Sequence, residues 1–375
     1  MDLAAQSAQN SSFNASSSQE KLVDFRRFDI QTLDFLFGSL YAFIVCVGVV
    51  GNCLVVAVVK RNSSMHSTTN YLLVNLAVAD IITLLWNPRT YSFAFYSSHP
   101  RGTLGDYLCK LFTGNGIIGV AIGASVLTLS TIAVERYHAL VKPLTAGNLK
   151  IQFENVRYVI VGIWTIALLI NLPDFLANRY DAKYGRCICP YSLESITDFR
   201  AHVLCTVFFL GGFPFLILGF CYFQIIKGIF FEKTIMGQAQ GQEDDKSKRK
   251  LAKLLLSVTM AFYTCYLPYG IFISFLTLSK RKTLIENQDS YAILLKAVEF
   301  LVTFSSFLNP VLYAFQSSNY RNGFVKICRF KRSVLPANET SVTFNIRDFN
   351  EKQNKMFRMA EPRLSFNISN LSEKS

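Results

Sequence analysis

Seven long apolar stretches, separated by short polar or basic segments, dominate the chain. Each stretch runs for roughly 20 residues or more, which is enough for a helix to cross about 30 Å of hydrocarbon. The stretches lie at about 35–59, 70–95, 109–137, 155–177, 201–231, 250–279 and 290–315. This pattern predicts an all-α membrane protein in which residues 35–315 form a seven-transmembrane helix bundle.

The segments outside the bundle differ from it in composition. Residues 1–34 are polar and Ser-rich and lack the regions of a signal peptide, so we expect a tail followed by a span that directs its own insertion. Residues 316–332 alternate basic and apolar groups, which predicts a short eighth helix lying in the membrane interface. Residues 237–248 are predicted to form a flexible loop, and residues 333–375 a disordered tail with Ser and Thr available for phosphorylation.

Composition and charge agree with a membrane protein. Charged residues make up 17% of the chain, whereas a soluble protein carries about 25%. The net charge of +13 could indicate a nucleic-acid partner, but the basic residues gather at one set of span ends, as cytoplasmic loops require. We therefore expect no nucleic acid, and a plasma-membrane protein with its N-terminus outside and its C-terminus in the cytoplasm. The sequons at Asn10 and Asn14 are then candidate glycosylation sites.

Asp80 and Glu299 fall inside apolar stretches, where an ionisable side chain is costly and therefore a functional candidate. Asp80 needs a cation, a proton or strong donors, and its functional interpretation is a site for a small cation such as sodium. Oxygen ligands would come from Ser125, Ser305 and Asn309, whereas the structural alternative is a protonated Asp80 hydrogen-bonded to a neighbouring helix. Glu299 is either a cavity-lining anion for a cationic ligand group or part of a buried hydrogen bond.

Five prolines stand within or at the ends of the predicted spans. Proline removes a backbone donor from a helix, and neighbouring helices or waters satisfy the freed carbonyl. Each resulting kink is a pivot between two packings, which favours a bundle that moves. The prolines are Pro88, Pro173, Pro214, Pro268 and Pro310.

Short motifs occur along the spans in a fixed order. They are Gly51-Asn52, Asn75-Leu-Ala-Val-Ala-Asp80, Ser125 with Glu135-Arg136-Tyr137, Trp164, Pro214 with Tyr222, and Asn309-Pro310-Val-Leu-Tyr313. From about residue 40 to 330 the chain resembles the rhodopsin-like class A of G-protein-coupled receptors, in its neuropeptide-receptor-like branch. The resemblance implies a receptor that activates a heterotrimeric G protein, with arrestin and receptor kinases acting on the C-terminal tail.

The resemblance also assigns roles at the inner end of the bundle. It implies that Arg136 is held at rest and contacts the G protein α subunit once the sixth span swings outward, while Tyr222 and Tyr313 fill the gap. The basic run 246–253 contains no acid that would hold Arg136, so we hypothesise a loosely held resting state. The expected coupling residues are Glu135, Arg136, Tyr137, Tyr222, Asn309, Pro310 and Tyr313.

Below the expected ligand pocket, the resemblance places an aromatic toggle formed by Phe262, Tyr266 and Pro268. Tyr266 stands where the family usually has Trp, and its hydroxyl adds a need for a polar partner. In the interfacial helix, Cys328 is a candidate palmitoylation site, with an inert thiol as the alternative.

The resemblance implies one disulfide on the extracellular side. Cys109 would pair with the second extracellular loop, where Cys187 and Cys189 are both available and Cys187 is slightly preferred. Cys109 also stands about two residues further from Arg136 than is usual in the family, which implies a bulge or a longer helix start.

The ligand is constrained mainly by exclusion. Ile118 stands where amine receptors carry an Asp, and Thr303 where opsins carry their retinal-binding Lys, so we expect neither an amine nor light. The second extracellular loop can form a short hairpin lid over an open cavity, which suits a peptide. Acidic and basic side chains nearby could receive charged ligand groups or could simply be solvated. The pocket candidates are Arg89, Ile118, Asp174, Lys296 and Glu299.

Other functions stay open as alternatives. Within the family, the ligand could be a small metabolite or a lipid. A transporter also needs intramembrane acids, but transporters usually show internal repeats and paired broken helices, which this sequence lacks. We expect no enzymatic activity, because there is no nucleophile–base pair, phosphate loop or metal cluster, and no cofactor apart from sodium as a possible allosteric modulator.

Overall fold

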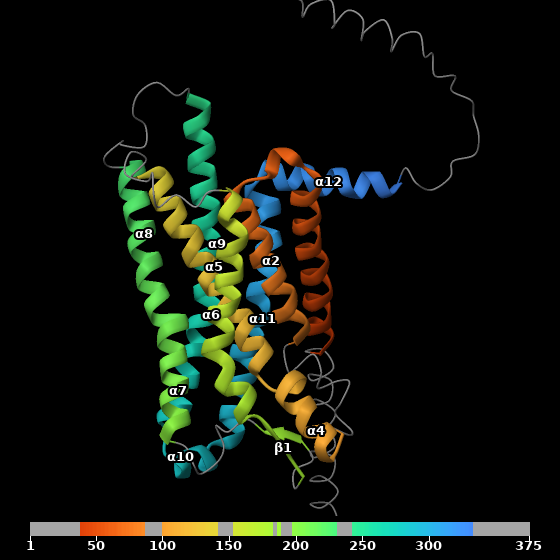
Figure 1. The fold of residues 1–375 in the computed structure, drawn as a ribbon, viewed down its shortest axis with the longest axis vertical. Coiled ribbons are helices and arrows are strands. Elements are labelled where there is room, and N and C mark those ends of the chain that lie inside the picture. Colours follow the sequence, from red (N-terminus) through yellow and green to blue (C-terminus); the bar gives the residue numbers. More distant parts are fainter. Residues whose placement is uncertain are drawn as a thin grey trace, which may run out of the picture. The chain divides into compact units, whose positions relative to one another are not determined.

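The structure is a computed structural model that describes residues 38–86, 100–141, 153–182, 186–188, 197–230 and 242–332. Within these residues, seven helices are long and apolar enough to cross a membrane. They are Gly38–Arg61, Thr68–Trp86, Gly102–Leu140, Val156–Ala177, Arg200–Gly228, Arg249–Leu278 and Gln288–Gln316. Figure 1 shows them packed side by side, with α12 (Ser318–Arg332) lying across one end. The predicted seven-helix fold with an eighth helix is confirmed.

A π-helical segment interrupts two of the seven spans, the third and the fifth. The third span consists of α4 (Gly102–Leu108), a π-helical segment (Cys109–Thr113) and α5 (Gly116–Leu140). The fifth consists of α7 (Thr197–Val207), a second π-helical segment (Phe208–Gly212) and α8 (Phe213–Phe230). The others are α2 (Thr68–Trp86), α6 (Val156–Ala177), α9 (Gln242–Leu278), α10 (Arg281–Glu286) and α11 (Gln288–Gln316), with 3-10 turns at Ser63–Met65 and Phe153–Asn155.

The two π-helical segments have identifiable causes. The first, together with the bend at 114–115, takes up the extra residues between Cys109 and Arg136, so the expected irregularity is present. The second ends just before Pro214, whose ring removes a backbone donor and needs the wider turn. Pro173, Pro268 and Pro310 lie inside α6, α9 and α11, as expected, whereas Pro88 lies outside the described residues.

A short hairpin lies at the end of the bundle opposite α12 (Figure 1). Strands β1 (Arg179–Asp181) and β2 (Arg186–Ile188) pair antiparallel, with Tyr180 opposite Cys187. Cys187 is bonded to Cys109, with a Cα–Cα distance of 5.3 Å. The backbone amide of Tyr180 donates to Asp106 Oδ1 at 3.3 Å. The hairpin is therefore fastened to the third span at two points, and the disulfide partner is Cys187; Cys189 lies outside the described residues.

A single buried amide joins three helices in the middle of the bundle. Asn75 of α2 donates through Nδ2 to the Thr128 hydroxyl of α5 at 2.7 Å. Its Oδ1 accepts the indole N–H of Trp164 in α6 at 2.8 Å. In a hydrocarbon setting an unsatisfied amide is costly, so this pattern fixes the register of the three helices.

The first helix and α11 meet where a proline has freed a carbonyl. Pro310 has no backbone N–H to give to the Ser306 carbonyl, and Asn52 Nδ2 donates to that oxygen instead, at 3.0 Å. Gly51 allows this approach, because a Cβ there would lie 2.8 Å from Cγ of Pro310. Gly51-Asn52 and Pro310 therefore form one packing unit.

One boundary prediction is wrong. Residues 242–248 belong to α9, whereas the sequence pattern assigned them to a flexible loop. Their Glu, Lys and Gln residues are good helix formers. The polar composition of these residues made the extension of α9 before its apolar span indistinguishable from a loop.

Candidate functional site

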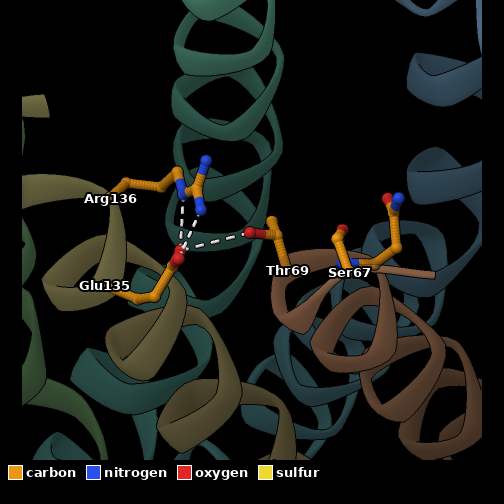
Figure 2. Close-up of polar contacts among 5 residues, drawn as sticks. Ser67, Thr69, Glu135 and Arg136 are labelled. Atoms are coloured by element: carbon orange, nitrogen blue, oxygen red, sulfur yellow. Dashed lines mark hydrogen bonds and ion pairs between the residues drawn. The ribbon is translucent and has the colours of Figure 1, made fainter. Parts of the chain in front are cut away.

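The C-terminal end of α5 carries a buried carboxylate and a guanidinium that bind each other (Figure 2). Arg136 donates to Glu135 Oε2 through Nε and to Oε1 through a terminal nitrogen. The Glu135 residue is 7% exposed. Among the described residues Arg136 is the cation paired with Glu135, and a buried acid that loses such a partner is strongly destabilised, so we expect this pair to restrain Arg136. Tyr137, the third residue of the motif, is buried and packs edge-on against Phe220 of α8.

Thr69 is a functional candidate that the sequence did not single out. It lies in the first turn of α2, and its hydroxyl donates to Glu135 Oε2 at 3.1 Å, as Figure 2 shows. The same carboxylate oxygen therefore accepts from both Thr69 and Arg136. A Thr near the start of a span has no distinctive sequence signal, because its value depends on which helix lies opposite.

A hydrogen bond between hydroxyls joins α8 and α9. Tyr222 and Thr259 lie 3.0 Å apart, oxygen to oxygen, and both are buried. Any outward movement of this part of α9 has to break that bond.

Tyr313 links α11 to α12. Its ring stacks on Tyr320, with centroids 5.1 Å apart, and the Tyr320 hydroxyl donates to Asn70 Oδ1 of α2 at 3.2 Å. Burial raises the pKa of the Tyr320 hydroxyl, so it stays a neutral donor. Asn70 follows Thr69 directly, so neighbouring residues of α2 contact both the Arg136 site and the Tyr313 site.

Asp80 lies at the centre of a buried polar cluster. The residue is 2% exposed, and Asn309 Nδ2 of α11 donates to its Oδ2 at 2.7 Å. The Ser306 hydroxyl, which the sequence did not single out, is buried on α11 and makes no hydrogen bond with any described residue. Ser125 and Ser305 are buried on α5 and α11. The structure thus brings Asp80 and Asn309 together.

The residues around Asp80 suit a small hard cation. Ser125 Oγ and Asn309 Oδ1 are buried and accept no hydrogen bond from any described residue. Together with the carboxylate they offer oxygen ligands, which sodium prefers and which softer metals do not. No group of three or more His, Cys, Asp or Glu side chains that could hold a metal occurs in the described part of the chain. The donor set therefore fits sodium, with Asp80 supplying the charge.

The expected toggle residues lie together on α9. Phe262 and Tyr266 of α9 stack with their ring centroids 4.0 Å apart, two turns or less from Pro268. Tyr266 is buried, so the polar requirement that a Tyr introduces in place of Trp applies inside the bundle.

A cavity of about 530 Å³ opens between α5, α6, α7 and the C-terminal half of α9. This space is called the bundle cavity below. Its walls are mostly aliphatic and aromatic, with a few amide, hydroxyl and charged groups. The lining includes Ile118, Asn171, Asp174, His202, Tyr263 and Tyr266.

The structure brings only part of the predicted ligand set to the bundle cavity. Ile118 and Asp174 line it, whereas Lys296 and Glu299 of α11 do not. Lys296 is exposed, and the Glu299 residue is half-buried with its backbone carbonyl accepting from Thr303 at 3.1 Å. His202 was missed, because a lone histidine near a span end has no distinctive sequence signal. Arg89, Asn10 and Asn14 lie outside the described residues, and Cys328 is exposed on α12.

Comparison with known proteins agrees with this geometry. The family model described as "7 transmembrane receptor (rhodopsin family)" matches residues 51–313. The C-X-C chemokine receptor type 2 of Mus musculus is 31% identical over 77% of this chain and 77% of that receptor. The somatostatin receptor type 4 of Rattus norvegicus is 30% identical over 79% and 73%, and the galanin receptor 2a of Danio rerio 28% over 79% and 79%.

The family match covers most of the chain and includes every motif from Gly51 to Tyr313. The relatives are signalling receptors, which speaks against both a transporter and an enzyme. Seven apolar helices and this family together indicate a multi-pass membrane protein. The chain belongs to the rhodopsin family of seven-transmembrane receptors, the class A G-protein-coupled receptors.

Proposed function

We propose that this chain is a G-protein-coupled receptor for an extracellular peptide and that it signals by releasing Arg136. One observation carries the proposal: a single helix serves two sites. In α5, Ile118 lines the bundle cavity, and Arg136 lies near the other end of the same helix. At 1.5 Å per residue the two are about 27 Å apart along the helix axis. A ligand that shifts α5, or α9 beside it, acts on both ends of the bundle.

The proposed change is a shift between two packings of the same helices. At rest, Glu135 and Thr69 hold Arg136, and Tyr222 is bonded to Thr259. In the signalling state the inner half of α9 pivots at Pro268, breaks the Tyr222–Thr259 bond and opens a space for a helix of the G protein α subunit. Coupling is reciprocal, so the G protein should in turn raise the affinity for the ligand.

A peptide is the ligand class that the outer end supports best. The bundle cavity has the size of a site for a compact ligand group. On the third span, the apolar side chain of Ile118 cannot pair with the ammonium group of an amine ligand. The disulfide fixes the hairpin β1–β2 beside the third span, so the hairpin offers a rigid surface against which the end of a peptide could pack. The relatives named for somatostatin, galanin and a chemokine favour the same class.

Orientation follows from charge. The end of the bundle near α12 carries a series of exposed or half-buried basic side chains, so we place it in the cytoplasm of the plasma membrane. They are Lys60, Arg61, Lys227, Arg249, Lys250, Lys253, Arg321 and Lys326. Residues 1–34 would then be extracellular and glycosylated at Asn10 and Asn14. Residues 333–375 would meet receptor kinases and arrestin, and Cys328 would be palmitoylated beside the bilayer.

Sodium is proposed as an allosteric modulator. A cation at Asp80 would bridge α2, α5 and α11 through Asn309 and Ser125 and so favour the resting packing. Ser305 remains a predicted further ligand. A peptide agonist that favours the other packing should compete with the ion.

The direct test is guanine-nucleotide exchange by purified receptor in lipid nanodiscs, with several G protein subtypes and a library of synthetic peptides. Arg136→Ala should abolish the exchange that a peptide induces, while surface expression survives. Arg61→Ala, a change of the same kind at an exposed inner position, should leave exchange intact. Exchange that persists in Arg136→Ala contradicts the coupling mechanism. Activation by metabolites or lipids but by no peptide contradicts the ligand class.

A further inference from the structure

The bundle cavity contains one carboxylate among its described lining residues, and that carboxylate faces a histidine. Asp174 lies near the end of α6, and His202 lies on α7. His202 Nε2 and Asp174 Oδ1 are 3.7 Å apart. The side chains of Asp174 and His202 are 11% and 16% exposed, and both line the bundle cavity, so a ligand there can reach both.

The histidine is a weak partner for this acid. The separation of 3.7 Å is longer than a good charge-assisted hydrogen bond, which spans about 2.7–2.9 Å. A guanidinium or an ammonium group could approach the carboxylate to the short distance of such a bond, and a guanidinium carries a permanent charge. Within the described residues no Lys or Arg forms an ion pair with Asp174. A permanent cation brought in by a ligand would therefore be the stronger partner.

The surroundings of Asp174 add a second requirement. Apolar and aromatic groups such as Val203, Tyr263 and Ile273 line the same cavity, and the Asp174 side chain itself is largely buried. An electrostatic attraction is stronger in such a site than in water. A ligand with a cation that pairs with Asp174 and an apolar residue next to that cation would use both the carboxylate and the apolar lining.

We propose that the activating peptide carries a cationic group, either an Arg or Lys side chain or a free amino terminus, which pairs with Asp174 and displaces His202. The class of ligand is thus a basic peptide with an apolar or aromatic residue next to its charge. This inference rests on the proposed function, because it assumes that the ligand is a peptide. Asp174 is a specificity-determining residue, and His202 is its resident competitor.

The test uses synthetic peptide amides that activate the wild-type receptor in the exchange assay. In each active peptide, the cation is replaced by a neutral group of similar shape: citrulline for Arg, norleucine for Lys or an acetyl cap on the amino terminus. Loss of one partner of a buried charge pair costs affinity steeply, so potency on the wild type should fall by about 30-fold or more. On Asp174→Asn the same replacement should change potency less than about threefold, because its partner is already gone.

Two further variants separate a ligand contact from a structural link between α6 and α7. If the pair only joins the helices, Asp174→Asn and His202→Asn should lower the potency of every peptide alike, whatever its charge. The proposal instead expects His202→Asn to keep or raise the potency of cationic peptides, since the competitor is removed. Glu299→Gln is the matched control, because it removes a charge from α11 outside the cavity lining, and it should leave the effect of citrulline unchanged.

The outcomes distinguish this inference from the proposed function. Active peptides that lack a cation, or that tolerate its loss on the wild type, overturn the inference and leave the peptide receptor standing. If Glu299→Gln abolishes the loss of potency that citrulline causes, the inference is also overturned, because the anion that binds the cation is then Glu299. Should Asp174→Asn fail to reach the surface, Asp174→Glu keeps the charge and must keep the preference for cationic peptides. A receptor that answers no peptide at all refutes the proposed function itself.

Discussion

Removing one hydroxyl at the inner mouth of the bundle should raise signalling without a ligand. The change is Thr69→Val, which keeps the shape of the side chain and removes its donor to Glu135. Because Oε2 of Glu135 accepts from both Thr69 and Arg136, the hydroxyl orients the carboxylate toward the guanidinium. Without it the resting arrangement loses a support that the signalling arrangement does not use.

The magnitude follows from the kind of bond. A hydrogen bond to a charged group contributes about 1.5–3 kcal/mol, and both partners are buried here, with Thr69 3% and Glu135 7% exposed. If only the resting state contains the bond, even the lower figure multiplies the ratio of signalling to resting receptor by about tenfold. The rise is visible as long as the signalling state is rare to begin with.

The assay is the rate of guanine-nucleotide exchange without agonist, at matched amounts of receptor in nanodiscs. Thr131→Val is the control, because it is the same chemical change one turn from Glu135, and the Thr131 hydroxyl donates only to the Leu127 carbonyl of its own helix, at 2.7 Å. Thr69→Val should raise basal exchange about tenfold, and Thr131→Val should not. Unchanged basal exchange refutes the reasoning. A lower rate would mean that Thr69 competes with Arg136 for the acid instead of supporting it.

Three other predictions concern the core of the bundle. Asp80→Asn should abolish the difference in agonist affinity between sodium and potassium buffers, and a persisting difference would place the ion elsewhere. Gly51→Ala puts a Cβ 2.8 Å from the Pro310 ring and should lower the free energy of unfolding by about 1–3 kcal/mol in a thermal assay. Gly162→Ala, in open space, should not, and equal effects would contradict the packing. Tyr320→Phe keeps the stack on Tyr313 and should lower the free energy of unfolding by about 0.5–1.5 kcal/mol, less than Tyr320→Ala does. Equal losses in the two variants would mean that the hydroxyl, and not the ring, provides the whole contribution of this side chain.

The helices of the bundle could be predicted from sequence because hydrophobic length is a strong signal in a membrane. Residues 242–248 could not, since a polar helix beyond the bilayer has the same composition as a loop. Asp80 and Asn309 could be joined because an acid and an amide inside apolar stretches need partners. Thr69 and His202 could not, because each gains its role from a residue on another helix. Such roles depend on rotation and register, which a single sequence does not encode in a visible pattern.

Two choices that the sequence left open, the partner of Cys109 and the acid that lines the cavity, are decided by which residues lie close together in the structure. Cys187 pairs with Cys109 because it lies on β2 beside the third span, a placement that spacing alone did not fix. Asp174 lines the bundle cavity while Glu299 does not, although both are acids near the outer ends of spans. The packing of α5, α6 and α7 decides between them.

The central claim is that the bundle has two arrangements and that Arg136 is held in one of them. Spin labels at Lys253→Cys on α9 and Lys60→Cys on the first helix, both exposed at the inner end, report the distance between these helices. The exposed free thiols of Cys46, Cys53, Cys205 and Cys328 would first be replaced by serine. With an activating peptide and G protein, we expect a second population at a longer distance, enriched by Thr69→Val even without peptide. One unchanging distance distribution under all of these conditions would contradict it.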